Sequence, residues 1–229
     1  MSGPNQKMDE SQRMQHSLAP PSAGSVQPFI LAGGRSSRFG ADKALAEVDG
    51  VRQIDRLAAM LGDHFSLPAV LLCSESTAAV HPDRPVLVDS GGSRGPASGL
   101  ATALEHLCLT CAAPWALLVP CDQFAWGREL TDALIKPWQP PADAIAISLL
   151  GRICPLPSLW HRRRAPFARS LAQSEHRSIA RSLAADPLSQ ILVRDDLASC
   201  LGSFNTPDEL KELQRRREAG GTMGGEASG

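Results

Sequence analysis

The feature that most constrains this chain is a regular alternation of short apolar runs with stretches of helical periodicity between residues 26 and 150. Apolar runs bounded by turn residues are typical of strands, and apolar residues spaced three or four apart are typical of helices. Strands are predicted over 26–32, 68–74, 84–90, 114–122 and 142–150, and helices over 51–65, 75–81, 95–109 and 127–138. This rhythm predicts an α/β fold, in which helices cover both faces of a mostly parallel central sheet.

The rest of the sequence follows this rhythm less closely. Residues 153–173 predict an extended piece interrupted by prolines and then a basic helix, and residues 176–186 and 189–196 predict a helix and an edge strand. The clearest helix start lies at Thr206, which is a good N-cap. Glu209 follows three residues later, so the two residues complete a capping box.

Composition and charge exclude two classes of partner and bound the folded part. The chain has 229 residues and a formal net charge of −1, so it lacks the basic surface with which proteins bind nucleic acid. No uninterrupted apolar run reaches the length of a membrane span, and the N-terminus lacks the apolar segment of a secretory signal. Composition predicts disordered tails over 1–25 and 218–229, on either side of one folded domain over 26–217.

The six cysteines are scattered and are interpreted as reduced thiols in a cytoplasmic protein. Cys108 and Cys111 form a C-x-x-C pair, but no second pair follows to complete a zinc site. Because they lie three residues apart in a predicted helix, they are expected to be buried thiols on one helix face. The histidines show no ligand spacing, and no role is assigned to them.

The first predicted strand runs directly into the segment GGRSSRFGADK, residues 33–43. This segment fits neither the P-loop pattern nor the dinucleotide fingerprint. Its glycines allow backbone N–H groups to approach a polyphosphate, and consecutive N–H groups form an anion-binding nest. Arg38 and Lys43 add two cationic side chains suited to phosphate oxygens. The alternative is a solvated glycine-rich turn with two surface cations, but the full combination favours a phosphate site.

Acidic residues stand at the carboxyl ends of the third and fourth predicted strands, at Asp89 and Asp122. Ligands of parallel sheets lie beyond the carboxyl ends of the strands, so both residues are expected to face the same crevice as residues 33–43. Mg²⁺ binds through one or two carboxylates plus substrate phosphates, and Asp122, alone or with Asp89, fits that requirement. The alternatives are that Asp122 caps the helix that follows it and that Asp89 is an ordinary turn residue.

Four segments, in the same order, resemble the signature motifs of the molybdenum cofactor guanylyltransferases, which are nucleotidyltransferases with a Rossmann-like three-layer fold. The segments are LAGGRSSRFGADKAL, VLVDSGGSRGPASGL, LLVPCDQF and FNTPDEL. The first is similar to the family pattern L-A-G-G-x-S-x-R-[MF]-G-x-D-K-x-L, and the third resembles the metal-binding P-C-D motif. The resemblance spans roughly residues 28 to 215 and implies that residues 26–217 form a nucleotidyltransferase domain.

The resemblance also implies a role for each matched residue. Nucleotide binding is implied for Leu31, Ala32, Gly33, Gly34, Arg35, Ser36, Ser37, Arg38, Lys43, Asp89, Gly95, Pro96 and Asp122. Catalytic roles are implied for Arg38, Lys43 and Asp122, and Mg²⁺ ligation for Asp122 and Asp89. Contacts with the acceptor are implied for Asn205 and Arg177.

The implied reaction transfers GMP from Mg-GTP to the phosphate of molybdopterin, forming the guanine dinucleotide cofactor and pyrophosphate. A molybdoenzyme or its chaperone is the implied protein partner. Gly34 favours guanine, because relatives that transfer a cytidylyl group usually carry L-A-A-G in place of L-A-G-G. The alternatives are cytidylyl or other nucleotidyl transfer to a different phosphorylated acceptor, and a non-catalytic nucleotide-binding carrier in cofactor insertion.

The chain departs from the family pattern in its later half. Cys154 stands where relatives often have Gln or His, Pro157 interrupts an expected strand, and Ser203 replaces the first Asn of N-x-N-T-P. These departures concern the acceptor more than the nucleotide. The arginine-rich run over 161–169 is interpreted as a solvated basic helix, and the alternative is a contact for an anionic substrate or an acidic partner.

Overall fold

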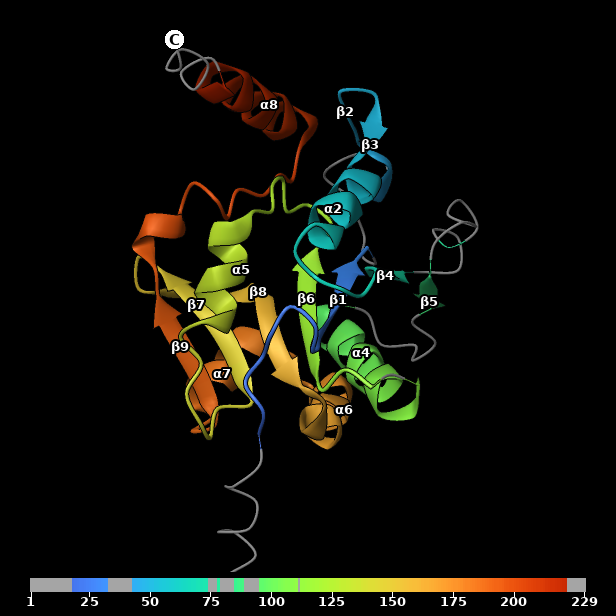
Figure 1. The fold of residues 1–229 in the computed structure, drawn as a ribbon, viewed down its shortest axis with the longest axis vertical. Coiled ribbons are helices and arrows are strands. Elements are labelled where there is room, and N and C mark those ends of the chain that lie inside the picture. Colours follow the sequence, from blue (N-terminus) through green and yellow to red (C-terminus); the bar gives the residue numbers. More distant parts are fainter. Residues whose placement is uncertain are drawn as a thin grey trace, which may run out of the picture.

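The computed structural model describes residues 18–32, 43–73, 78, 85–88, 95–110 and 112–221. Within these ranges a seven-stranded sheet forms the centre of the fold, in the order β5-β4-β1-β6-β8-β7-β9 (Figure 1). The strands are β1 (Val26–Leu31), β4 (Val70–Cys73), β5 (Val86–Val88), β6 (Trp115–Pro120), β7 (Ala144–Leu149), β8 (Arg152–His161) and β9 (Ser189–Val193). The strands predicted from the sequence are therefore confirmed.

The sheet is mostly parallel, as predicted. β1 pairs in parallel with β4 and with β6, β4 with β5, and β7 with β9. Among the seven described strands of this sheet, β8 alone runs antiparallel, and it lies between β6 and β7. The carboxyl ends of β1, β4 and β6 therefore lie at the same edge of the sheet.

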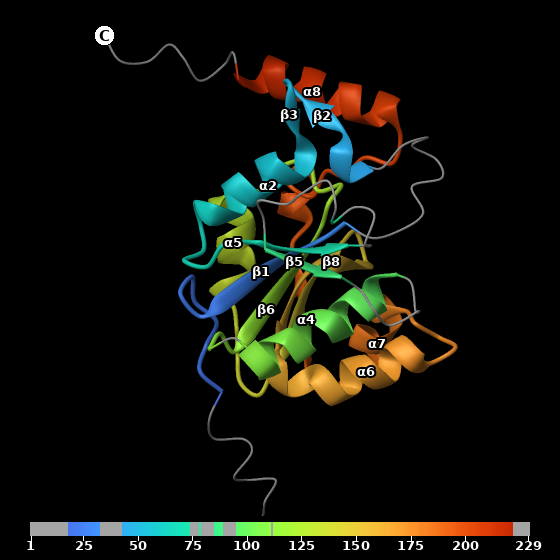
Figure 2. The same ribbon diagram turned by 90° about the vertical axis from the view of Figure 1, so that its right-hand side faces the viewer.

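Helices cover both faces of the sheet and complete three layers (Figure 2). The α-helices are α2 (Gln53–Gly62), α4 (Pro96–Thr110), α5 (Arg128–Ile135), α6 (Ala165–Gln173), α7 (Ile179–Ala185) and α8 (Pro207–Gly221). α2 and α5 pack on one face, and α4, α6 and α7 on the other. No helix in the described ranges is long and apolar enough to cross a bilayer. The helix predicted over 75–81 lies outside the described residues, apart from Ala78.

β6 shows why one strand can be apolar along its whole length. Its side chains alternate between the two cores, with Trp115, Leu117 and Val119 facing α2 and α5, and Ala116 and Leu118 facing α4 and α6. All five are fully buried. A strand that is covered on both faces has no solvent side, so it needs no polar alternation.

β8 differs from the expected proline-broken piece, because it is one strand that contains a bulge. Ser158 pairs with Ala146 and Cys154 pairs with Ile147, so residues 155–157 are left out of the ladder. Two of these three residues are prolines. Proline has no N–H to donate, so it fits where no ladder bond is needed.

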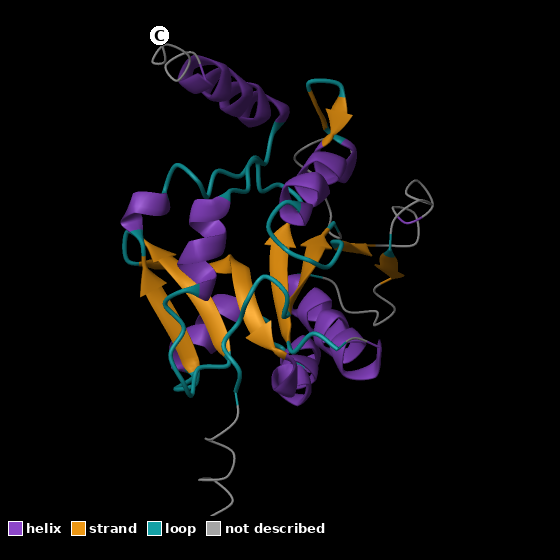
Figure 3. Cartoon of the chain, in the orientation of Figure 1, coloured by secondary structure: helices purple, strands orange, loops and turns teal. Residues whose placement is uncertain are grey.

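A small hairpin follows β1 and was not predicted. It consists of β2 (Glu47–Val48) and β3 (Val51–Arg52), joined by Asp49 and Gly50 with φ of 54° and 75°. Positive φ at both central residues defines a type I′ turn, for which Asp-Gly is a favoured sequence. Figure 3 shows that this hairpin and α8 both extend beyond the main sheet.

The hairpin and α8 are joined to the loop after β6 by a third, smaller core. Val48, Phe124, Phe204 and Leu210 are buried together in it, away from the two cores that flank the sheet. These residues come from β2, from the loop after β6, from the segment before α8 and from α8 itself. Burial of apolar surface therefore holds three segments distant in sequence at one end of the molecule.

The start of α8 confirms the predicted N-cap. Thr206 Oγ1 accepts a hydrogen bond from the Glu209 N–H at 3.2 Å, and the Glu209 carboxylate accepts the N–H of Asn205. The capping box is therefore displaced by one residue, because its usual second donor is the N–H of the cap residue itself. The backbone of α8 runs to Gly221, past the expected domain end at residue 217.

Residues 18–25, which the sequence analysis assigns to a disordered tail, are packed on the fold. The Trp115 indole N–H donates to the Ala19 carbonyl at 3.1 Å, and Ser22 and Ser25 close a turn before β1. A buried indole N–H needs an acceptor, and this segment supplies it. Residues 1–17 and 222–229 lie outside the described residues, so disorder of these parts of the tails stays a prediction.

The interpretation of the arginine-rich run over 161–169 as a solvated basic helix is corrected for Arg163 and Arg164, while Arg169 is exposed on α6. The Asp143 side chain is 2% exposed, and its two oxygens accept from Arg163 at 2.6 Å and from Arg164 at 2.5 Å. Arg164 also pairs with Asp186. The run instead joins the start of β7 to the end of β8 and to the segment before β9.

The five cysteines within the described ranges are free thiols, as predicted. Cys111 lies outside these ranges. Cys108 is exposed rather than buried, and this expectation is corrected. Cys108 lies one turn after Leu104, near the C-terminal end of α4, and its thiol donates to the Arg162 carbonyl at 3.6 Å instead of packing in the core.

His161, the last residue of β8, lies at the edge of the core, and its pKa is lowered. Burial, followed by the nearby charges of Arg163 and Arg162, lowers its pKa from 6.5 to about 4. Its Nδ1 accepts the N–H of Arg163 at 3.2 Å, and its ring meets the Trp115 ring edge-on at 5.1 Å between centroids. The folded protein therefore favours the neutral ring.

We expect the free energy of unfolding to fall as the pH drops from about 6.5 to about 4. Over this window the unfolded chain protonates His161 while the folded chain does not, so the contribution is complete above pH 6.5 and lost toward pH 4. Allowing for partial solvent exposure, the loss is about 1–2 kcal/mol. Urea unfolding at several pH values measures it. His161→Asn, which keeps an acceptor for the Arg163 N–H, should flatten the slope, and the exposed His176→Asn should not. Equal slopes in all three proteins would contradict this assignment.

Candidate active site

The carboxyl ends of β1 and β6 lie side by side, because these strands are adjacent and parallel. Backbone bonds hold the two strand ends: the Cys121 N–H donates to the Leu31 carbonyl at 3.0 Å, and the Ala32 N–H donates to the Leu72 carbonyl at 2.8 Å. The chain also reverses its strand order here, since β1 lies between β4 and β6. Open α/β sheets bind their ligands at such a position.

Lys43, Asp122 and Asn205 meet at this edge of the sheet. Lys43 Nζ lies 3.1 Å from Asp122 Oδ2 and donates to Asn205 Oδ1 at 2.7 Å. The side chains of Lys43 and Asp122 are 14% and 21% exposed, so the ion pair is mostly buried and a small part of it remains accessible to a ligand. We call these three residues the Lys43 cluster. When an ammonium and a carboxylate lie together, the ammonium can bind an anionic ligand and the carboxylate can bind the cation that accompanies it.

Each member of the Lys43 cluster is held by a separate element. Lys43 begins the short 3₁₀ helix η1 (Lys43–Leu45), and Asp122 lies two residues after the end of β6. Asn205 lies between buried Phe204 and the N-cap of α8. The Phe204 N–H donates to the Asp122 carbonyl at 3.3 Å, which places Asn205 beside the loop after β6.

Asp122 does not cap the helix that follows it, so that alternative is wrong. α5 begins at Arg128 and its N-cap is Gly127, with no side-chain hydrogen bond at the cap. The described partner of the Asp122 carboxylate is the ammonium of Lys43. Its position therefore agrees with a role in binding rather than in helix capping.

The start of α4 lies against the end of β1. Gly95 has a φ of +112°, which side chains rarely adopt, and its carbonyl accepts the N–H groups of Ser98 and Gly99 as Pro96 opens the helix. A Cβ on Gly99 would lie 2.4 Å from Cδ2 of Leu31, so the glycine lets the helix approach the strand end closely. The first turns of α4, which follow Gly95 and Pro96, thus pack against Leu31. All three residues are predicted to bind the nucleotide.

Several predicted site residues cannot be placed relative to the Lys43 cluster. The phosphate loop residues and the second acidic residue lie outside the described residues; they are Gly33, Gly34, Arg35, Ser36, Ser37, Arg38 and Asp89. Arg177 lies between α6 and α7, where its Nε donates to the Ser174 carbonyl at 3.0 Å. Within the described ranges no three His, Cys, Asp or Glu residues form a group that could hold a metal. The roles of these residues stay predictions.

Sequence reasoning missed three polar residues that support the loop after β6. Gln53 and Gln123 are buried, and their side-chain amides bond backbone carbonyls, as does the guanidinium of Arg56. Burial lowers the pKa of Arg56, with the Arg217 charge adding to the effect. The available signal was a glutamine on the buried face of an amphipathic helix and another directly after Asp122.

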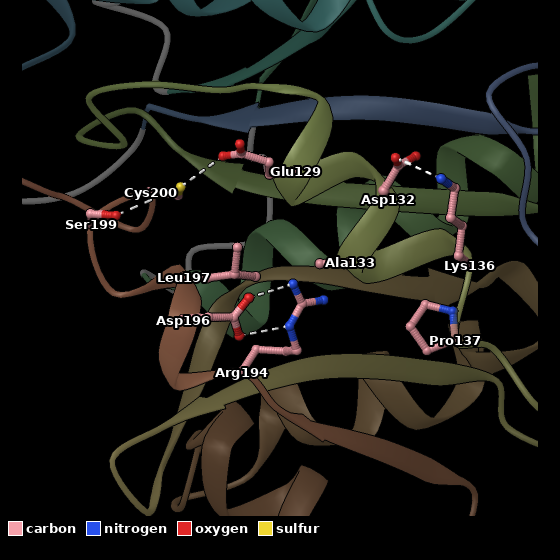
Figure 4. Close-up of a pocket in the computed structure, with 10 residues that line it drawn as sticks. All are labelled: Glu129, Asp132, Ala133, Lys136, Pro137, Arg194, Asp196, Leu197, Ser199 and Cys200. Atoms are coloured by element: carbon pink, nitrogen blue, oxygen red, sulfur yellow. Dashed lines mark hydrogen bonds and ion pairs between the residues drawn. The ribbon is translucent and has the colours of Figure 1, made fainter. Parts of the chain in front are cut away.

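A separate cavity of about 590 Å³ lies between α5 and the segment after β9 (Figure 4). Its wall carries charges that are already paired: Arg194 with Asp196 at 2.7 Å, and Lys136 with Asp132 at 2.8 Å. The thiol of Cys200, another wall residue, donates to Glu129 at 3.3 Å, and the pKa of this thiol is raised by burial and by that carboxylate. No member of the Lys43 cluster lines this cavity.

Known proteins match this chain in sequence and in fold. The profile of the MobA-like NTP transferase domain matches residues 28–189. A molybdenum cofactor guanylyltransferase from Rhizobium rhizogenes is 27% identical over 201 residues, which cover 83% of this chain and 91% of the relative. Molybdopterin-guanine dinucleotide biosynthesis protein A from Archaeoglobus fulgidus superposes with a TM-score of 0.69 at 18% identity, over 84% of this chain and 99% of that one. A protein from Mycobacterium tuberculosis in complex with manganese gives a TM-score of 0.59 at 15% identity, over 83% and 98% of the two chains.

The profile match covers more than half of the chain and includes the segments that carry Lys43 and Asp122. The mostly parallel sheet with helices on both faces agrees with the fold of the solved relatives. The site geometry, the fold and the sequence match therefore point to the same conclusion. This chain belongs to the MobA-like NTP transferase family and is a nucleotidyltransferase.

Proposed function

We propose that this enzyme transfers GMP from GTP to the phosphate of molybdopterin, releasing pyrophosphate and forming the guanine dinucleotide cofactor. The observation that carries the proposal is the Lys43 cluster, in which residues of three separate motifs meet at the carboxyl edge of the sheet. The named relative from Rhizobium rhizogenes, which this chain matches over most of its length, supports this choice of reaction.

The reaction brings two anions together, so the protein must neutralise charge and align the reactants. An oxygen of the acceptor phosphate forms a bond to the α-phosphorus of the nucleotide, and the bond from that phosphorus to pyrophosphate breaks. The Lys43 ammonium would bind a phosphate oxygen of the nucleotide. Asn205, on the segment before α8, would face the acceptor, which is the role that its N-T-P motif implies.

Asp122 fits the role of a magnesium ligand. Mg²⁺ keeps several waters and binds through one or two carboxylates plus phosphates, so a site with few carboxylates suits it. In the structure the Asp122 carboxylate already faces a cationic group, Nζ of Lys43, and is partly exposed. Asp122, together with Asp89, would hold the ion, which when bound supplies positive charge to the phosphates. The manganese complex of the Mycobacterium tuberculosis protein supports a divalent metal.

Residues outside the Lys43 cluster are also proposed to determine the choice of nucleotide and acceptor. Gly34 supports guanine, while Arg38 and the rest of the loop over 33–42 are proposed to hold the triphosphate. The acceptor side carries the departures Cys154 and Ser203. Ser203 lies opposite Gln123 in an isolated bridge, next to the site. A molybdoenzyme or its chaperone is the proposed recipient of the product.

A screen of nucleotides and acceptors that measures pyrophosphate release tests the proposal. With Mg²⁺ and molybdopterin, we expect release from GTP at least about tenfold faster than from CTP, since a site built for one base rejects another through unpaired polar groups. Faster release with CTP, or with another phosphorylated acceptor, would replace the proposed substrates. GTP binding without release under any condition would favour a carrier.

A further inference from the structure

Gln53, the first residue of α2, joins the segments that carry Lys43 and Asp122. Its backbone N–H donates to the Ala46 carbonyl at 2.7 Å, and the Ala46 N–H donates to the Lys43 carbonyl at 3.2 Å. Its side chain is fully buried, and Nε2 donates to the carbonyl of Gln123, the residue after Asp122, at 2.6 Å. Gln53 therefore bonds the backbone of the segment that carries Lys43 and the backbone of the segment that carries Asp122.

Arg56, three residues further along α2, fixes the orientation of the Gln53 side-chain amide. Arg56 Nε donates to Gln53 Oε1 at 3.3 Å, which leaves the Gln53 Nε2 donor to face the Gln123 carbonyl. The same guanidinium donates to the Phe124 carbonyl and lies 4.5 Å above the Phe124 ring. The side chains of Gln53 and Arg56 thus bond two consecutive carbonyls of the loop after Asp122, those of Gln123 and Phe124.

The Gln123 side chain holds the same loop from within. Its Nε2 donates to the carbonyls of Ala125 and Cys200, both at 2.8 Å, and its backbone bridges to Ser203. A loop buried at this depth must bond its backbone polar groups, and here side chains do so in place of a helix or a strand. The loop is therefore restrained on both sides, and Gln53 is its link to Lys43.

We propose that Gln53 is a positioning residue that sets the Asp122 carboxylate and the Lys43 ammonium relative to one another. In the structure Gln53 connects to both segments through bonds of 2.6 and 2.7 Å, while the two charged groups stand 3.1 Å apart. Displacement of a catalytic group by about 1 Å can cost about a hundredfold in rate. The catalytic part of this inference rests on the proposed function, and the structural linkage does not.

The test compares Gln53→Glu with Gln190→Glu. A glutamate at position 53 has the same shape but no hydrogen to donate to the Gln123 carbonyl. Gln190 makes the matched bond elsewhere, since its Nε2 donates to the Pro137 carbonyl at 2.7 Å from the edge strand β9. Both variants therefore lose one amide-to-carbonyl hydrogen bond and gain one carboxylate.

Hydrogen exchange followed by mass spectrometry is the readout that needs no activity. In Gln53→Glu we expect amide exchange to rise by at least about tenfold in peptide 121–126, because the Gln123 carbonyl loses the side-chain donor of residue 53. Peptide 43–48 should exchange as before, because the backbone bond from residue 53 to the Ala46 carbonyl is kept. Gln190→Glu should leave both peptides unchanged. Unchanged exchange in peptide 121–126 of Gln53→Glu would overturn the linkage.

Steady-state kinetics test the consequence. In Gln53→Glu we expect kcat to fall by about 10- to 100-fold while the KM for GTP stays within about threefold, because alignment is lost more than binding. A purely structural role would lower the thermal midpoint and leave kcat unchanged well below it, and that result would overturn the proposal. If Gln53→Glu does not fold, Arg56→Lys, which keeps the charge but not the forked donor, should give the same changes in smaller measure.

The two proposals fail in different ways. If the unaltered enzyme releases no pyrophosphate with any nucleotide and acceptor, the proposed function fails, and hydrogen exchange in peptide 121–126 still decides whether the Gln53 side chain holds the loop after Asp122. If the unaltered enzyme is active and Gln53→Glu matches it in kcat, the positioning role fails and the proposed function stands.

Discussion

Replacement of Asp122 by alanine is expected to lower magnesium-dependent pyrophosphate release by about a thousandfold, which corresponds to about 4 kcal/mol of lost transition-state stabilisation. The change removes the carboxylate proposed to hold the cation at the reacting phosphates. The fold should survive, because the side chain is partly exposed and Lys43 keeps its hydrogen bond to Asn205. Initial rates over a range of Mg²⁺ concentrations measure the effect.

Asp132→Ala is the matched control for this prediction. Asp132 is also an aspartate close in sequence to the site, but its carboxylate pairs with Lys136 at 2.8 Å on the surface of α5. An exposed pair of this kind contributes about 0–1 kcal/mol, so turnover should stay within about twofold of the unaltered enzyme. If Asp122→Ala retains full turnover with the same magnesium dependence, Asp122 is not the metal ligand.

Replacement of Asp143 by alanine is expected to lower the free energy of unfolding by about 3–5 kcal/mol. The carboxylate is almost fully buried and bonds two arginines, so its removal leaves Arg164 buried with only the Asp186 contact. The same change removes the side-chain bonds that join the start of β7 to the segment after β8, since both arginines follow β8 directly. Urea unfolding monitored by circular dichroism measures the loss.

Glu105→Ala is the control for the stability prediction. Glu105 on α4 pairs with Arg169 on α6 at 2.7 Å, and the two side chains are 40% and 61% exposed. Because solvent screens this pair, its loss should cost less than about 1 kcal/mol. Equal losses in Asp143→Ala and Glu105→Ala would show that the buried pairs stabilise the fold no more than a surface pair does.

The sequence predicted those elements whose signals lie within a few residues. β6 was found because six consecutive residues are apolar or proline, and α8 was found because its cap and first turn follow one another directly. Periodicity and capping chemistry act over three to seven residues, so they are readable without knowledge of the fold. The prediction of a phosphate site at residues 33–43 depends on the same kind of local signal.

The sequence did not predict elements that depend on direction or on distant partners. An apolar run has no direction, so β8 could be recognised as extended but not as antiparallel. Its direction follows from the tight turn at Leu150 and Gly151, where φ is 49° and 74° at the two residues. A two-residue turn can join only antiparallel strands. The hairpin of β2 and β3 was missed because two-residue strands are too short to show periodicity.

The charges of the arginine run illustrate the same limit. Four arginines within residues 161–169 predict a solvated surface by composition. Asp143 and Asp186, which neutralise two of them, lie about 20 residues away along the chain on either side. Whether a charge is exposed or paired depends on what the fold packs against it, and composition does not contain that information.

The sequence by itself determined the class of chemistry, since the residues able to bind phosphate and a metal lie in short motifs. Only the tertiary structure decided that Lys43 meets Asp122, 79 residues away, and Asn205, 162 residues away. It also decided that Gln53 supports both segments of that pair. The physical reason is that local rules act within one turn or one strand, whereas these contacts follow from strand order and from the burial of apolar faces, which are properties of the whole chain.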